Sequence, residues 1–215
     1  MGGFDWGAIW YAVPYMLQGA LVTLEIWVCA MALATLVRLM MGLVSVSRRL
    51  GLLKAVVRAY VYFVRGTPAL VQVFLVYFAL PRIGLELSAF SSGVVALEKA
   101  GFISEIVRAG LQSIDSGQTE AALSIGMTER QSILFILLPQ SLRRITPPLT
   151  NEAITLVKTS SLLSVISISE LTRSAQVIVA ERFVPFELYL ALAVYYLVMI
   201  SVLSWCSEFV EKRLA

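Results

Sequence analysis

A row of polar side chains interrupts the fourth hydrophobic segment of this 215-residue chain. At about 100° per residue, Glu152, Thr155 and Thr159 share one face of a helix, and Lys158 and Ser160 flank that face. Lipid offers no hydrogen-bond partners, so a helix that is polar over such an arc faces protein or an aqueous cavity. A carboxylate there attracts an ammonium group, and hydroxyls hold polar atoms. These residues predict a substrate path; the alternative is pairing across a dimer interface.

Catalytic chemistry is not expected. Histidine is absent, which removes the commonest general base and transition-metal ligand. There is no cluster of metal-ligating residues and no nucleophile with an obvious base. A P-loop needs a Gly-Lys pair, and none occurs anywhere in the chain. We therefore expect no enzyme activity, no metal and no cofactor in this chain.

Other ionisable residues also fall within hydrophobic segments, where each costs about 2.5–3.5 kcal/mol to insert. Glu105 and Arg108 are three residues apart and can pair on one helical face. We predict a structural clamp between helices there, with gating of the pathway as the alternative. Arg65 lies near the end of its segment, where its long side chain can reach the headgroups.

Composition explains what positions these residues. The chain is 59% hydrophobic and only 14% charged, which points to a membrane protein. At about 20 residues per spanning helix, its length allows about five. An aromatic stretch at about 1–18 predicts an interfacial N-terminal segment. The predicted spans are residues 19–45, 57–80, 89–113, 149–171 and 187–208. We expect Pro147 and Pro148 to open the fourth span.

Basic residues in the loops predict the orientation of these spans. One side carries nine of them: Arg48, Arg49, Lys54, Arg58, Arg130, Arg143, Arg144, Lys212 and Arg213. The other side carries three: Arg82, Arg173 and Arg182. The first side is therefore predicted to be cytoplasmic, with the N-terminus outside and the C-terminus inside. Residues 114–148 then form a cytoplasmic loop.

That loop reads as two short helices joined by a sharp bend. Asp115 with Gln118 can cap the first helix, and Gly126 suits a left-handed residue that ends it. Thr128 with Gln131 forms a second capping-box pattern. The apolar run that follows ends at Pro139, where we expect a kink or a break.

The loop resembles the EAA loop of binding-protein-dependent ABC importer permeases. The residues that match that pattern are Glu120, Ala121, Ala122, Gly126, Ile136, Leu138 and Pro139. In that family the loop forms the coupling helix that docks on a cytoplasmic ATPase. The alternative is that this stretch is an amphipathic surface helix that matches the pattern by chance. Three further stretches are similar to amino-acid permeases: 63–72, around Arg65-Gly-Thr-Pro and Gln72; 102–114, around Glu105 and Arg108; and 151–162, from Asn151 to Leu162.

The resemblance implies a type I ABC importer permease fold, all-α and forming one domain over 1–215. It implies the translocation subunit of an ATP-driven importer of polar amino acids, basic ones included, in the bacterial inner membrane. Expected partners are an ATPase dimer carrying ATP and Mg, a second permease subunit and an extracytoplasmic solute-binding protein. Gln72 joins the five residues of the polar face as a substrate-binding candidate. The alternative is a secondary transporter driven through Glu25, Glu105 and Glu152.

Overall fold

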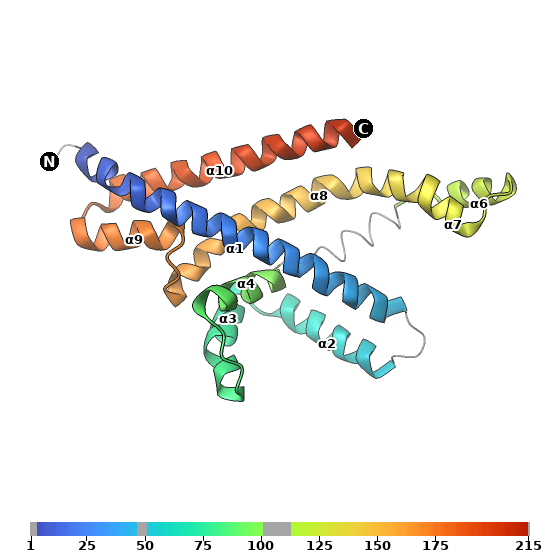
Figure 1. The fold of residues 1–215 in the computed structure, drawn as a ribbon, viewed down its shortest axis with the longest axis horizontal. Helices are drawn as coiled ribbons and strands as arrows, with labels where there is room; N and C mark the ends of the chain where they lie inside the picture. Colours follow the sequence, from blue (N-terminus) through green and yellow to red (C-terminus); the bar gives the residue numbers. More distant parts are fainter. Residues whose placement is uncertain (1–3, 47–50, 101–112, 215) are drawn as a thin grey trace. The chain divides into compact units, whose positions relative to one another are not determined.

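The computed structural model describes residues 4–46, 51–100 and 113–214, and within these ranges every regular element is a helix (Figure 1). The predicted all-α class is therefore confirmed. The α-helices are α1 (Trp6–Val46), α2 (Gly51–Gly66), α3 (Ala69–Phe74), α4 (Ala89–Ala100), α6 (Ser116–Ser124), α7 (Glu129–Gln131), α8 (Leu138–Thr159), α9 (Leu171–Arg182) and α10 (Pro185–Leu214). Four shorter helices are η1 (Leu75–Ala79), η2 (Leu80–Ile83), η3 (Ser132–Leu137) and η4 (Ser160–Ile166); η1 and η3 are π-helical, and η2 and η4 are 3-10 helical.

The chain divides into two compact units. Unit 1 comprises Met1–Gly101 and Thr155–Ser201, and unit 2 comprises Phe102–Ile154 and Val202–Ala215. Each unit is described by itself below.

In unit 1 the first half of α1 packs along α9 and the start of α10 (Figure 1). Residues at every fourth position of α1 make one buried stripe, in which three of the four side chains are alanine. Its members are Ala8, Ala12, Met16 and Ala20. They meet Leu171, Ala175 and Ile178 of α9 and Leu188 of α10. Small residues at such a seam let two helix backbones approach closely.

The start of α9 is fixed by side-chain hydrogen bonds. Glu170 is fully buried and caps the helix by accepting from the backbone N–H groups of Thr172 and Arg173, at 2.9 and 2.7 Å. The Tyr196 hydroxyl donates to the same carboxylate at 3.3 Å. Thr23 of α1 accepts from the Leu171 N–H at 3.2 Å. These bonds satisfy donors that a helix start would otherwise leave unpaired.

The second half of α1 packs into a separate apolar cluster of unit 1. Ile26 and Ala30 of α1 meet Val73 of α3, Leu97 of α4 and Leu163 of η4, all essentially buried. This cluster joins segments far apart in the sequence around α1.

Four of the predicted spans coincide with helices. The first coincides with α1, although α1 already begins at Trp6, so the predicted interfacial segment is continuous with the span from that residue on. Trp6 and Trp10 are 66% and 75% exposed on it. The fifth coincides with α10. The Trp6–Val37 stretch of α1 and the Pro185–Arg213 stretch of α10 are each long and apolar enough to cross a membrane.

The second and fourth spans are each bent pairs that satisfy the same criterion only when joined, giving up to four spans among the described residues. The second breaks between α2 and α3 at Thr67 and Pro68. Proline lacks an N–H and disfavours a helical residue before it, which explains why the helix over the predicted span 57–80 is interrupted there. Residues 101–112 of the predicted third span lie outside the described residues.

One prediction about prolines was wrong. Pro147 and Pro148 lie inside α8, which begins at Leu138, and do not open a new helix. At Pro139, the second residue of α8, the helix does not break, although the π-helical η3 gives way to α8 one residue earlier; the predicted kink there stays a prediction. Proline is more readily tolerated inside membrane-spanning helices than in helices in water.

Candidate functional site: the coupling hairpin, the α8 residues and the α1–α9 groove

The predicted coupling segment forms a hairpin in unit 2, made of α6, a bend and α7. The Asp115 carboxylate caps α6 by accepting from the Gly117 N–H at 2.7 Å. The prediction that Asp115 caps this helix is confirmed. Gln118 does not complete that cap. Its side-chain oxygen Oε1 instead accepts from the side-chain amide of Gln140 of α8 at 3.3 Å.

The bend and the restart of the helix also follow the prediction. Gly126 has a φ of +86°, the left-handed region that favours glycine. Thr128 then caps α7 with a reciprocal pair of bonds. Its N–H donates to the Gln131 side chain at 2.8 Å, and its hydroxyl accepts from the Gln131 N–H at 3.3 Å. The predicted capping box is confirmed.

The hairpin packs with one small face and leaves the rest open. Ala122 is buried, and α6 packs against η3. The other matching positions are exposed or half-buried: Glu120, Ala121, Gly126, Ile136, Leu138 and Pro139. Apolar Leu123 and Ile125 are also exposed, at 43% and 79%. An exposed apolar surface on a short, doubly capped hairpin can bind another protein.

The polar residues at the C-terminal end of α8 and the start of η4 separate into two groups in unit 1. Thr155 and Lys158 are exposed, and Thr159 is half-buried. Ser160 is fully buried and donates to the Val157 carbonyl at 2.7 Å. The side chains of Thr155, Lys158 and Thr159 can therefore contact a solute outside the unit. The Ser160 hydroxyl is instead bonded to the backbone three residues earlier.

Glu152 belongs to unit 2 and is half-buried there. Two residues earlier on α8, Thr150 forms a hydroxyl–hydroxyl hydrogen bond with Ser207 of α10. The Ser207 hydroxyl donates to the Glu211 carboxylate at 3.3 Å. A chain of polar side chains thus joins α8 to the end of α10 within this unit.

Gln72 stabilises the turn between α2 and α3. It is only 4% exposed, and its amide nitrogen donates to the backbone carbonyls of Val64 and Thr67 at 2.8 and 2.9 Å. No described residue donates to its carbonyl oxygen, Oε1, which is buried. That oxygen is the part of Gln72 that remains available as an acceptor. Arg65 lies exposed at the end of α2.

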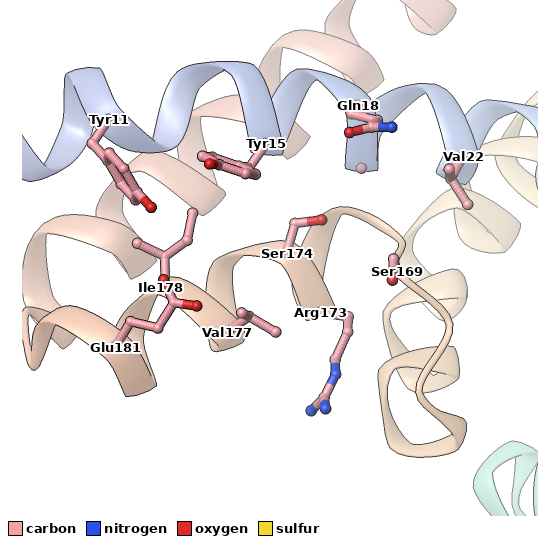
Figure 2. Close-up of a pocket in the computed structure, with 11 residues that line it drawn as sticks. Tyr11, Tyr15, Gln18, Val22, Ser169, Arg173, Ser174, Val177, Ile178 and Glu181 are labelled. Atoms are coloured by element: carbon pink, nitrogen blue, oxygen red, sulfur yellow. The ribbon is translucent and has the colours of Figure 1, made fainter.

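Unit 1 also carries a groove of about 360 Å³ between α1 and α9 (Figure 2). Tyr11, Tyr15 and Gln18 contribute from α1, and Arg173 and Glu181 from α9. At its outer end the Arg182 guanidinium lies 3.9 Å from the centre of the Tyr11 ring. The sequence analysis missed this groove. Its signal is the spacing of three and four residues on both helices, which places these side chains on facing stripes.

Two predicted positions cannot be placed. Glu105 and Arg108 lie outside the described residues. Over 4–46, 51–100 and 113–214, no group of three or more acidic or cysteine side chains could hold a metal ion. The candidate site therefore consists of a capped hairpin with an exposed apolar surface and of polar residues on apolar helices. This arrangement is the one expected of a membrane transport subunit.

The comparisons with known proteins agree with that class. Residues 36–215 match the family of binding-protein-dependent transport system inner membrane components. The chain belongs to this family. It is thus a permease subunit of an ABC importer in the inner membrane and is not itself catalytic. The predicted family and localisation are confirmed, and the secondary-transporter alternative finds no support.

Individual relatives match over nearly the whole chain. The glutamine transport system permease protein GlnP of Escherichia coli (strain K12) is 38% identical over 217 residues, 98% of each chain. The probable glutamine ABC transporter permease protein GlnM of Bacillus subtilis (strain 168) is 43% identical over 158 residues, 73% of each.

Solved structures share the fold. A transporter described as an amino acid ABC transporter with histidines matches with a TM-score of 0.88 at 34% identity, over 99% of this chain and 100% of that one. The MetNI methionine ABC transporter in an inward-facing conformation matches with a TM-score of 0.67 at 18% identity, over 98% of this chain and 99% of that one. The predicted type I importer permease fold is confirmed.

Proposed function

We propose that this permease imports a polar amino acid, with glutamine and histidine as the first candidates. Glutamine is named for the E. coli relative, which matches over 98% of both chains, and histidine for the solved transporter. The near-complete match to GlnP carries the proposal. Proteoliposomes containing the permease, its ATPase and its binding protein should take up labelled glutamine or histidine in an ATP-dependent way. Uptake of sugars or metal ions alone would refute the amino-acid assignment.

The ATPase partner is proposed to bind the coupling hairpin. The cap of α6, the left-handed Gly126 and the exposed apolar Ile125 support this, because they give a defined helix with an unpartnered surface. The ATP and Mg belong to that partner. The change Ile125→Asp should abolish co-purification of the ATPase. The matched change Leu85→Asp, at a 55% exposed position between η2 and α4 and outside the predicted spans, should leave the ATPase bound.

The remaining assembly follows from the family. We infer a second permease subunit and an extracytoplasmic binding protein, with the N-terminus outside and the C-terminus in the cytoplasm. Orientation is tested by single cysteines after Cys29 and Cys206 are changed to serine. A membrane-impermeant maleimide should label Phe183→Cys, at an 85% exposed site, in intact cells. It should label Ser116→Cys only in inverted vesicles, and the opposite pattern would refute the orientation.

The substrate contacts are proposed to come from Glu152, Thr155, Lys158, Thr159, Ser160 and Gln72. These residues differ in how accessible their side chains are. Thr155 and Lys158 are exposed, and Glu152 and Thr159 are half-buried. Ser160 and Gln72 are buried and would offer only their side-chain oxygens. Glu152 would attract a cationic side chain or the α-ammonium group. The change Glu152→Gln should reduce uptake of a basic amino acid far more than uptake of glutamine. An equal loss for both would refute recognition of side-chain charge.

A further inference from the structure

The N-terminal arm of the coupling hairpin is tied back to α8 by side chains that the EAA pattern does not include. The Arg144 guanidinium donates from Nη1 to the Ser113 backbone carbonyl and, at 3.0 Å, to the Ser113 hydroxyl. Ser113 lies two residues before Asp115, the cap of α6. One side chain of α8 thus holds the backbone directly in front of the coupling helix.

A second link lies one turn along α8. The Gln140 amide donates to the Gln118 side chain at 3.3 Å. Gln140 and Arg144 are four residues apart and therefore lie on the same face of α8. The three hydrogen bonds of these two links hold the first turn of α6 and Ser113, which lies just before it. All four residues belong to unit 2.

These links attach the start of α6 and the residue just before it directly to α8. At its other end the hairpin continues covalently through α7 and η3 into α8. Between α6 and α7 the chain passes the bend at Gly126, which has no side-chain packing to stiffen it. Apart from Arg144, the described contacts that connect α6 with α8 are the Gln140–Gln118 bond, the packing of the Ala122 face against η3 and the chain through this bend.

We propose that Arg144, supported by Gln140, is a positioning residue that makes α6 move as one body with α8, so that ATPase movement reaches the translocation helices. The proposal rests on the proposed function, because it assumes that an ATPase moves α6. A hydrogen bond from a charged donor is stronger than one between neutral groups, which makes Arg144 the main link. α8 then carries the movement, since it runs without a break from Leu138 to Thr159.

The neighbouring arginine is a matched control. Arg143 is also exposed and carries the same charge, but its side chain makes no hydrogen bond or ion pair with any other described residue. Complexes of permease, ATPase and binding protein are reconstituted with Arg144→Ala, Arg144→Lys, Gln140→Ala or Arg143→Ala. The measured quantity is the ratio of solute imported to ATP hydrolysed. Hydrogen exchange of the amides of 116–119 is followed in the same complexes.

Arg144→Ala should lower the transport ratio several-fold while the ATPase stays bound, and should speed exchange of the first turn of α6 by about tenfold or more. Arg144→Lys should bring the transport ratio and the exchange rate part of the way back to their wild-type values. Arg143→Ala should change neither of these two quantities. An unchanged ratio in Arg144→Ala, or an equal fall in Arg143→Ala, overturns the proposal. If Arg144→Ala does not assemble, Gln140→Ala decides: a lowered ratio supports the link and an unchanged ratio refutes it. A wild-type complex without ATP-dependent uptake would refute the proposed function, and the exchange comparison would then decide the link alone.

Discussion

Replacement of Gly19 should destabilise the chain, because α1 approaches the start of α9 most closely there. A Cβ atom at this position would lie 2.5 Å from the Ser174 hydroxyl, 2.9 Å from the Leu171 Cα and 3.1 Å from the Glu170 carbonyl carbon. The hydroxyl can rotate away, but the two backbone atoms cannot. Glu170 and Leu171 are also held by the cap and by the bond to Thr23.

The size of the effect follows from these contacts. Overpacking costs about 1–3 kcal/mol, and two backbone clashes place Gly19→Ala in the upper part of that range. Alanine is preferred over glycine inside a helix by about 0.5–1 kcal/mol, which offsets part of the cost. The net loss in the free energy of unfolding is then about 1–2 kcal/mol. For a chain of this size that lowers Tm by about 2–8 °C.

The assay is thermal unfolding of the purified permease in detergent, with Gly51→Ala as the matched control. Gly51 begins α2 and has no atom within 4 Å of the Cβ position. Its replacement should change the free energy of unfolding by less than about 0.5 kcal/mol. A Gly19→Ala protein with the Tm of wild type would refute the close approach of α1 and α9.

Three further changes test local features. Gly126→Ala has room for its side chain but places alanine in the left-handed region, so it should lower the free energy of unfolding by about 1–2 kcal/mol. Hydrogen exchange across the bend should become faster, and unchanged exchange would contradict the bend. Thr128→Ala removes the cap of α7 and should speed exchange of the Gln131 amide about fivefold, with Thr128→Ser restoring it; equal exchange in both variants would contradict the cap. Gln72→Leu keeps the volume but leaves the Val64 carbonyl without this donor, so Tm should fall as expected for a loss of about 1–3 kcal/mol. A Tm equal to that of wild type would show that Gln72 does not stabilise the turn.

The local features of the hairpin were predictable from the sequence because each depends on residues close in the chain. Asp115, Gly126 and the Thr128–Gln131 box act over two or three residues. Pro147 and Pro148 were misjudged, because proline preferences in water favour helix starts, whereas here both lie inside α8. Membrane-spanning helices tolerate proline in their interior.

The positions of long-range contacts could not be read from the sequence. The groove joins Tyr11 and Tyr15 of α1 to Arg173 and Glu181 of α9, more than 150 residues later. Helical spacing gives a polar stripe on each helix but does not say which stripes meet. For the same reason Gln72 stood out only by its motif, and its bonds to Val64 and Thr67 became visible only in the folded turn.

The energy source of transport tests the central claim most directly. Proteoliposomes holding the permease with its ATPase and binding protein are loaded with ATP, and uptake of labelled glutamine is measured with and without a protonophore. An ABC importer permease predicts uptake that requires ATP and persists when ion gradients are dissipated. Uptake that survives without ATP but collapses with the gradient would contradict the account.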